Sequence, residues 1–323
     1  MVLFLTDAEI ERLIDIETLA PIVERALEKQ HSGEVERPER PHYPIGADLD
    51  SSEPLGTGLV MPAYIHAKEY FATKLVSLHD GNKKRSLPML HAQIVLSDAR
   101  TGQPAAFMDG TRITNARTGC IGGLAARELA NEPITLGVIG AGAQARWQTR
   151  AIAALTDIES VSVYSPSDSK HDCVADLREH GISANAVDTP AAAVRDASVV
   201  VTATTSSEPV FPAAALSPGT VVVAVGAYDA EMQELEPAVF DRASRVFADV
   251  PEEVTTIGDL AATDLAADDL IPIAALFEGT TGRESRDEIL VVESVGTAVL
   301  DAAAATEVYE AAREKGVGTT QPT

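Results

Sequence analysis

Residues that cross-link a chain or hold a metal are scarce in this sequence. Its 323 residues include only two cysteines, Cys120 and Cys173, and no His-x-x-x-His or Cys-x-x-Cys spacing occurs. Two cysteines give no disulfide framework and favour a reducing compartment, and scattered histidines give no zinc site. We therefore expect a cytoplasmic protein that binds no metal.

Long apolar runs are also absent. The longest are too short to span a membrane, and the first residues, MVLFLTDAEIERL, lack the basic start and cleavage site of a signal peptide. The chain is still 45% hydrophobic, so it can bury a large core, and its length suggests about two domains. The sequence thus predicts a globular protein with no membrane partner.

Positive charge is scarce too. Only 25 Lys and Arg stand against 49 Asp and Glu, a formal net charge of −24. Without a basic face, nucleic-acid binding is not expected. An acidic partner-binding tail is one explanation, but the acids are spread over the whole chain. We favour a surface adapted to high salt, where screening removes the self-repulsion of the charges, and hypothesise a halophilic protein.

The strongest motif lies in residues 134–155. An apolar run ends in GAGAQA at positions 140–145, and a helical pattern follows. Gly140 permits a tight turn, Gly142 lets the backbone approach a pyrophosphate, and Ala145 stands where close helix–strand packing needs a small residue. The helix N-terminus offers N–H groups to phosphates. The pattern predicts dinucleotide binding; a purely structural strand–turn–helix is the alternative.

Strands alternate with helices after residue 133, which predicts a parallel, doubly wound sheet. The final helix, 296–314, follows the last strand and can return to the N-terminal part, so that the dinucleotide-binding domain is an insertion. The expected strands are residues 134–139, 161–164, 183–187, 199–203, 221–225 and 289–292, and the expected helices are 143–155 and 169–180.

The first 115 residues predict a mainly antiparallel sheet flanked by helices. Thr6 and Glu9 form a capping box, Pro21 can start a second helix, and residues 32–54 read as a loop or irregular edge strand. A small-residue helix, 114–130, closes this part and must pack closely on a neighbour. The expected strands are residues 58–63, 70–78, 91–96 and 105–109, with a hairpin at 97–104.

The loop after the second strand of the parallel sheet bears on the choice of cofactor. A carboxylate at this place favours NAD, whereas hydroxyl and basic groups accept the 2′-phosphate of NADP. Here the loop reads SPSDSK, so Ser165, Ser167, Ser169 and Lys170 favour NADP, and Asp168 argues for NAD. A serine-rich surface turn without a ribose contact is the alternative.

Three basic residues are candidates for chemistry. Lys74 lies in an apolar strand pattern, FATKLV, as either an edge residue pointing to water or a buried cation with a lowered pKa. Arg117, in the first turns of the small-residue helix, can clamp a carboxylate or be an ordinary surface arginine. Arg40, by pattern alone, is a solvated loop charge.

Tyr228 and Asp229 follow the expected strand 221–225. Residues just beyond the carboxyl end of a parallel strand face the ligand crevice. Asp229 is therefore a candidate acid/base or ammonium partner; a capping role in the acidic loop 229–236 is the alternative.

Taken together, the motifs resemble the ornithine cyclodeaminase/mu-crystallin family over nearly the whole chain. DGTRITNARTG followed downstream by GAGAQA is the most specific combination. The stretches that show the resemblance are MPA (61–63), KLVS (74–77), residues 86–130, GAGAQA (140–145), TATTSSEPV (202–210) and SVGTAVLDAAAA (294–305).

The resemblance implies an α/β protein that works as a homodimer of two-domain subunits. Residues 116–295 would form the Rossmann domain, with NAD or NADP bound, and residues 1–115 with 296–323 the substrate-binding and dimerisation domain. Family members act on amino acids or their imines: ornithine cyclodeaminase, an archaeal type of alanine dehydrogenase, and ketimine reductases of cyclic imino acids such as pyrroline-2-carboxylate. Mu-crystallin also binds thyroid hormone.

The resemblance also assigns roles. Lys74 matches the family's active-site lysine, and Arg117 and Arg40 match arginines that bind the substrate carboxylate. Tyr228 stands where cyclodeaminases and archaeal alanine dehydrogenases have a catalytic Asp, and Asp229 follows one residue later. The residues expected to contact the cofactor are Thr118, Gly140, Gly142, Ala143, Gln144, Ser165, Ser167, Lys170, Ala203 and Thr204.

The sequence therefore predicts an NAD(P)H-dependent reductase of the C=N bond of a small imino acid, with NADP favoured over NAD. The substrate would be a cyclic ketimine or, in an alanine dehydrogenase, iminopyruvate. One alternative is ornithine cyclodeaminase, with Asp229 as acid/base. Another is a mu-crystallin-like binding protein; the retained Lys74 and Arg117 argue against it.

The charge hypothesis predicts a salt-dependent stability. Because screening weakens repulsion among the 49 acidic residues, the melting temperature should rise steadily from low salt to molar KCl. Thermal unfolding followed by circular dichroism across a KCl series measures this. A melting temperature that does not increase with KCl would rule out the halophilic hypothesis.

Overall fold

Residues 118–296 interrupt a unit that is built from the two ends of the chain. The computed structural model describes residues 1–49, 52–85 and 87–322. It divides into a first unit, Met1–Arg117 with Thr297–Thr323, and a second unit, Thr118–Gly296. Asp50 and Ser51, in the stretch expected to be irregular, and Ser86, which opens a family-like stretch, lie outside the described residues.

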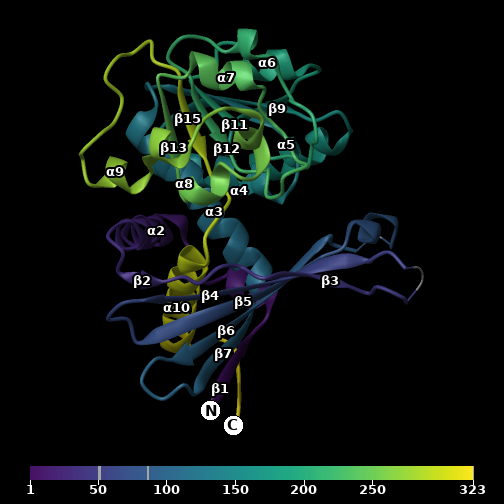
Figure 1. Ribbon diagram of the computed structural model, residues 1–323, viewed down its shortest axis with the longest axis vertical. Helices are drawn as coiled ribbons and strands as arrows, with labels where there is room; N and C mark the ends of the chain where they lie inside the picture. Colours follow the sequence, from purple (N-terminus) through teal and green to yellow (C-terminus); the bar gives the residue numbers. More distant parts are fainter. Residues whose placement is uncertain (50–51, 86, 323) are drawn as a thin grey trace. The chain divides into compact units, whose positions relative to one another are not determined.

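The first unit contains a mainly antiparallel sheet, as predicted (Figure 1). Its strands run in the order β16-β1-β7-β6-β5-β4-β2, and β3 pairs with β4. Among the strand pairs of the described residues, only β1–β7 is parallel. The strands are β1 (Val2–Leu5), β2 (Val35–Glu36), β3 (His42–Ile45), β4 (Gly56–Ile65), β5 (Tyr70–Leu78), β6 (Leu90–Asp98), β7 (Pro104–Asp109) and β16 (Thr319–Gln321); a 3₁₀ turn, η1 (Asp80–Arg85), follows β5.

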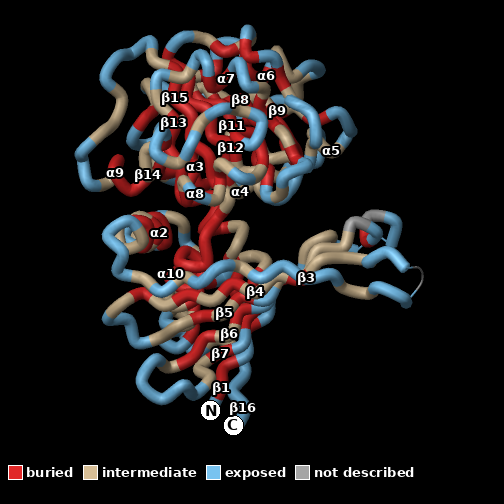
Figure 2. The backbone as a smooth tube through the Cα atoms, in the orientation of Figure 1, coloured by how far each residue is buried: buried red, intermediate tan, exposed pale blue. Residues whose placement is uncertain are grey.

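Helix α10 (Ala298–Lys315) packs against β4 and β5 and against α2 (Ile16–His31). Figure 2 shows α10 as buried and the β3 hairpin as largely exposed. The capping box before α1 (Asp7–Glu11) is confirmed. The prediction that Pro21 starts a helix is wrong: the Asp15 side chain accepts the N–H of Thr18 at 3.1 Å, so α2 begins earlier and contains Pro21.

The second unit contains an entirely parallel sheet, which confirms the predicted Rossmann-type fold. The strand order is β10-β9-β8-β11-β12-β15-β13-β14, with β8 at the point where the winding direction changes. Strands buried on both faces explain the continuous valine runs. The strands are β8 (Ile134–Ile139), β9 (Ile158–Tyr164), β10 (Ala184–Ala186), β11 (Val199–Thr202), β12 (Val221–Ala224), β13 (Arg245–Ala248), β14 (Ile271–Pro272) and β15 (Leu290–Glu293).

Short helices connect these strands. Besides the 3₁₀ turns η2 (Ala213–Ala215), η3 (Gly258–Ala262) and η4 (Ala267–Asp269), they are α4 (Ala143–Leu155), α5 (Ser169–Glu179), α6 (Pro190–Val194), α7 (Pro237–Arg242), α8 (Pro251–Val254) and α9 (Ala274–Phe277). Among the described residues, no helix is both long and apolar enough to cross a membrane.

Helix α3 (Gly110–Leu129) begins in the first unit and ends in the second. It starts earlier than residue 114, where it was expected, because the Asp109 side chain accepts the N–H of Thr111 at 2.9 Å. The predicted close packing of this helix is confirmed. A Cβ added at Gly119 would lie 2.7 Å from the carbonyl oxygen of Trp147 in α4, so a larger side chain has no room there.

Candidate active site

Lys74 lies on β5, an interior strand, and only 2% of it is exposed. It pairs with Met61 of β4 on one side and with Ile94 of β6 on the other. The alternative of an edge residue pointing to water is therefore wrong. A lysine in such a place needs a partner, and its Nζ lies 2.5 Å from Oδ2 of Asp301 in α10.

Asp301 also binds Arg117 of α3. The Arg117 Nε donates to Asp301 Oδ1 at 2.9 Å, and the Thr114 hydroxyl lies 3.5 Å from both Lys74 Nζ and Asp301 Oδ1. Arg117 is 4% exposed and Asp301 1%. Two cations and one anion leave one excess positive charge among these buried groups. In the part of the chain that the structure describes, Arg117 has no other polar partner, so its terminal NH₂ groups can bind an anion such as a carboxylate.

Burial and nearby charges adjust proton affinity at this cluster. Burial lowers the pKa of Lys74 to about 8; Asp301 opposes the shift, and Arg117 and Arg40 add to it. Burial acts to raise the pKa of Asp301, but Arg117 and Lys74 together hold this pKa below its ordinary value. Lys74 therefore holds a proton at neutral pH and can release it readily to a bound ligand.

Arg40 is half-buried in the segment between β2 and β3. Its positive charge acts on Lys74, which places both residues in one positively charged region of the first unit. The interpretation of Arg40 as a purely solvated loop charge is therefore incomplete.

The glycine turn between β8 and α4 has the geometry that a dinucleotide needs. Gly140 has φ +114°, and a Cβ there would lie 2.4 Å from the carbonyl oxygen of Ala203, so only glycine fits. Gly142 precedes α4 without a side-chain cap, and an added Cβ would meet no atom within 4 Å. Open space thus lies beside Gly142, next to Ala143 and Gln144 at the N-terminus of α4, where a pyrophosphate fits.

The remaining residues of this turn and its surroundings serve packing. Ala145 is fully buried against the sheet, as its position in the motif requires. Thr118 is 8% exposed, and its carbonyl oxygen accepts the side-chain N–H of Gln148 at 2.8 Å. Thr118 therefore fixes α3 to α4 through its backbone carbonyl group.

Beyond β9, three serine hydroxyls form a cluster. The Oγ of Ser165 lies 3.3 Å from those of Ser167 and Ser169, which are 2.7 Å apart. Lys170 donates to the carbonyl oxygen of Val187 at 3.1 Å and pairs with an exposed carboxylate of the same loop region. The three hydroxyls are thus adjacent to one another, as binding of a ribose phosphate would require, whereas the Lys170 ammonium group binds the segment after β10.

Ala203 and Thr204 follow β11 at the carboxyl edge of the sheet. The N–H of Thr204 donates to a buried carboxylate, Glu234 Oε1, at 2.6 Å. Burial, with a contribution from Asp259, raises the pKa of Glu234 to about 7, and burial raises that of Asp259 to about 6. Burial also raises the pKa of Glu293, at the end of β15, well above its ordinary value.

Tyr228 and Asp229 lie in the loop after β12. Tyr228 is 38% exposed. The Oδ1 of Asp229 accepts the N–H groups of Glu231 and Met232 at 3.0 and 3.1 Å, which is the bonding of a loop-capping aspartate. The carboxylate therefore already stabilises its own loop.

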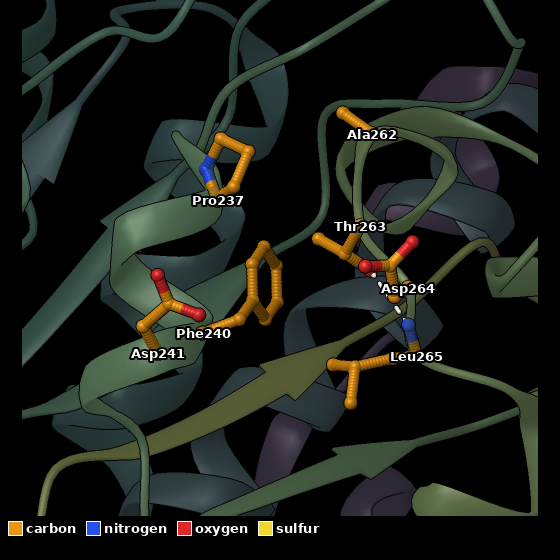
Figure 3. A pocket seen from close by; sticks show the side chains of 7 residues that line it. All are labelled: Pro237, Phe240, Asp241, Ala262, Thr263, Asp264 and Leu265. Carbon is orange, nitrogen blue, oxygen red and sulfur yellow. Dashed lines mark hydrogen bonds between the residues drawn. The ribbon is translucent and has the colours of Figure 1, made fainter.

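Two hollows of the surface contain none of the candidate site residues. One, of about 310 Å³, lies in the second unit, where Phe240 faces Thr263 and Leu265 (Figure 3). Another, of about 490 Å³, lies in the first unit between α2 and α10. Among the described side chains, no group of three or more His, Cys, Asp or Glu is arranged to hold a metal ion.

A Rossmann-type sheet with a glycine turn, together with a buried Lys–Asp–Arg cluster, defines an α/β protein of the nucleotide-binding class. The chain belongs to the ornithine cyclodeaminase/mu-crystallin family, whose model matches residues 1–316. It is 33% identical over 298 residues to Δ1-pyrroline-2-carboxylate reductase of Bacillus cereus, covering 87% of this chain and 89% of that protein.

Solved structures agree with this assignment. Δ1-Pyrroline-2-carboxylate reductase of Thermococcus litoralis, in complex with NADH and L-proline, superposes with a TM-score of 0.92 and 31% identity, covering 99% of this chain and 100% of that one. The dimer of an archaeal alanine dehydrogenase with bound NAD gives a TM-score of 0.90 and 32% identity, covering 99% of each chain.

Asp301 and Glu234 are two further residues of these sites that were not among the predicted candidates. For Asp301 a signal was present: one acidic residue stands inside the alanine-rich helix pattern VLDAAAA, where a charge on an apolar face must have a buried partner. Glu234 lies in a loop with several other acids, and nothing in the pattern distinguishes it from them.

The geometry of the glycine turn predicts that the same glycine-to-alanine change affects stability at one position and cofactor binding at the other. Gly140→Ala should destabilise the fold by about 1–3 kcal/mol, because φ is positive and the methyl group meets the Ala203 carbonyl. Gly142→Ala should leave stability unchanged but weaken NADH binding about tenfold, because its methyl group fills open space. Denaturant unfolding and NADH fluorescence measure both; equal behaviour of the two variants would contradict the proposed phosphate position.

The buried cluster predicts a large stability loss on removal of its anion. Asp301→Asn leaves Lys74 and Arg117 buried without a counter-charge, which should reduce the free energy of unfolding by about 3–5 kcal/mol. Glu69→Gln is the matched control, because the Glu69–Arg100 pair is exposed on the surface. Urea unfolding compares them, and an Asp301→Asn protein as stable as the control would show that the ion pairs do not hold these elements together.

Proposed function

We propose that the protein is an NAD(P)H-dependent reductase of a small imino acid. The single observation that supports this most directly is the buried cluster of Lys74, Arg117 and Asp301, with its excess positive charge. An imino acid has a carboxylate for an arginine to bind and a C=N bond next to it for an ammonium group to polarise. The reductase relative is named for an imino acid of this class, and the dehydrogenase relative is named for an amino acid, alanine.

In this proposal Arg117, assisted by Arg40, holds the substrate carboxylate and so orients the C=N bond. Lys74 donates a proton or a hydrogen bond at the nitrogen, which makes the neighbouring carbon electrophilic. The chemistry that a bound NADH or NADPH would supply is the hydride for that carbon. Asp301 keeps Lys74 oriented and raises its proton affinity against the larger, opposite effect of burial.

The residues of the second unit fit a nicotinamide dinucleotide. The turn at Gly140 and Gly142 would bind the pyrophosphate, and Ser165, Ser167 and Lys170 would lie near the adenosine ribose. The hydroxyl cluster favours NADP, whereas the two solved relatives described above contain NADH or NAD. A homodimer is part of the proposal, since the archaeal alanine dehydrogenase was solved as a dimer.

Ornithine cyclodeamination is the less favoured reaction. It would need Asp229 as acid/base, and the Asp229 carboxylate binds the N–H groups of its own loop. Asp229→Asn separates the reactions, because imine reduction that continues at a near-normal rate in this variant would exclude an essential carboxylate at position 229.

The test is a substrate panel in molar KCl. Oxidation of NADH and NADPH is followed with pyrroline-2-carboxylate, piperideine-2-carboxylate and pyruvate plus ammonium, beside release of ammonia from ornithine. We expect reduction of at least one imine and no ornithine deamination. A protein that binds NADH but reduces none of these imines would refute the proposed function and favour a binding protein.

Lys74 should determine both the rate and its pH dependence. Lys74→Ala should lower kcat by about 10²–10⁴-fold, as expected on loss of a positioned proton donor. Since the pKa of Lys74 is about 8, imine reduction should decline as pH rises above that value and the ammonium group loses its proton. A kcat/KM–pH profile measures this. Full activity of Lys74→Ala, or a profile flat from pH 7 to about 9, would exclude the role.

A further inference from the structure

One buried carboxylate links two loops at the carboxyl edge of the parallel sheet in the second unit. Glu234 Oε1 accepts the N–H of Thr204 at 2.6 Å, and Glu234 Oε2 accepts the hydroxyl of Thr202 at 3.0 Å and the N–H of Gly226 at 2.8 Å. Thr202 ends β11, and Gly226 lies just beyond β12. Since β11 and β12 are parallel neighbours, both loops leave the same edge of the sheet.

Glu234 is itself held firmly. The N–H groups of Glu234 and Leu235 donate to Asp259 Oδ1 at 2.5 and 2.8 Å. The N–H of Gln233 donates to the carbonyl oxygen of Ser206 at 2.8 Å, so the loop after β11 is bound a second time. Because hydrogen bonds hold both the backbone and the side chain of Glu234, this residue can fix the positions of the loops that it binds.

The loops approach each other too closely for a side chain at the contact. A Cβ added at Gly226 would lie 2.4 Å from the carbonyl oxygen of Thr204 and 2.6 Å from Glu234 Oε1. In the described residues, no Lys or Arg pairs with Glu234, so only neutral N–H and O–H donors compensate the charge. Burying a carboxylate without an opposite charge is energetically unfavourable, more so than holding an ordinary surface loop requires.

What these loops contain gives a reason for this cost. In open parallel sheets, ligands bind outside the carboxyl ends of the strands. The loop after β11 contains Ala203 and Thr204, and the loop after β12 contains Tyr228 and Asp229. The glycine turn at 140–145 and the serines after β9 are suited to the phosphates and the adenosine ribose. The nicotinamide half of the cofactor is therefore left to the loops that Glu234 joins.

We propose that Glu234 is a positioning residue for the nicotinamide half of the dinucleotide: it fixes the loops after β11 and β12 against which that half binds. The inference rests on the proposed function, because it requires a nicotinamide cofactor. It does not depend on which imine is reduced. Glu234 touches neither hydride donor nor substrate in this role; it acts through the loops.

The test separates the two halves of the cofactor. Glu234→Gln keeps the shape of the side chain, but its NH₂ group replaces one acceptor and opposes an N–H donor. We expect the Kd for NADH to rise about tenfold, with a lower kcat, while the Kd for ADP-ribose, which lacks the nicotinamide, stays within about twofold of the parent. Titration calorimetry measures both ligands, and unchanged ADP-ribose binding shows that the fold is intact.

Two further variants keep the test decisive. Glu236→Gln is the matched control, since Glu236 lies in the same loop but binds the N–H of Ala213, away from the ends of β11 and β12. Thr202→Val removes one of the three bonds to Glu234 with little change in shape, and it should weaken NADH binding in the same direction by a smaller factor. If Glu234→Gln does not fold, Thr202→Val replaces it.

Several results would overturn the proposal. The first is an NADH affinity like that of the parent in Glu234→Gln or, if that variant does not fold, in Thr202→Val. The second is an equal loss of affinity for NADH and for ADP-ribose. The third is a loss of NADH affinity in Glu236→Gln as large as that in Glu234→Gln. The outcome remains distinct from that of the proposed function. A parent protein that binds NADH but reduces no imine refutes the function alone, whereas a parent that binds no NADH refutes both.

Discussion

The first unit depends on one interaction, the pairing of the Asp301 carboxylate with two buried cations. It joins Lys74 of β5 and Arg117 of α3 to α10, so that three elements far apart in the sequence meet at one buried point. Residues 118–296 lie between Arg117 and Asp301 in the chain. Since neither cation can remain buried alone, the C-terminal helix must return to the N-terminal sheet for the first unit to be stable. The same pairing that completes the fold also leaves one positive charge for a ligand.

The two units bury side chains of opposite charge. In the first, cations outnumber the anion, and the surplus suits a carboxylate. In the second, Glu234, Asp259 and Glu293 gather near the carboxyl edge of the sheet, and burial raises the pKa of each. That region favours neutral or cationic groups, so an anionic pyrophosphate is better placed at the glycine turn, where open space lies beside Gly142 at the N-terminus of α4. The distribution of buried charge therefore agrees with the separate positions proposed for the different parts of the ligands.

Local sequence patterns predicted the fold well because each element depends mainly on its own residues. Buried valine runs indicate parallel strands, and the GAGAQA turn indicates its own backbone geometry. Lys74 and Arg117 were identifiable as candidates, but their burial was not, since it depends on β4, β6 and α10 packing around them. The partners of Asp301 lie 184 or more residues away in the sequence, and those of Glu234 lie up to 32 residues away. A single sequence does not reveal such pairings. The prediction that Pro21 starts a helix was wrong because another local signal, the Asp15 cap, begins the helix earlier.

The overall charge bears on how an anionic substrate reaches a cationic cluster. A protein with a net charge of −24 repels imino-acid anions at low ionic strength, where its field extends about 30 Å at 0.01 M salt. In molar salt the screening length falls to about 3 Å, which removes this long-range repulsion. Attraction within the cluster of Lys74, Arg117 and Asp301 is far less affected, because the groups are buried and water and ions are excluded. If the protein works in high salt, its acidic surface and its positive site are therefore compatible: the medium suppresses the surface field, and burial preserves the field of the site.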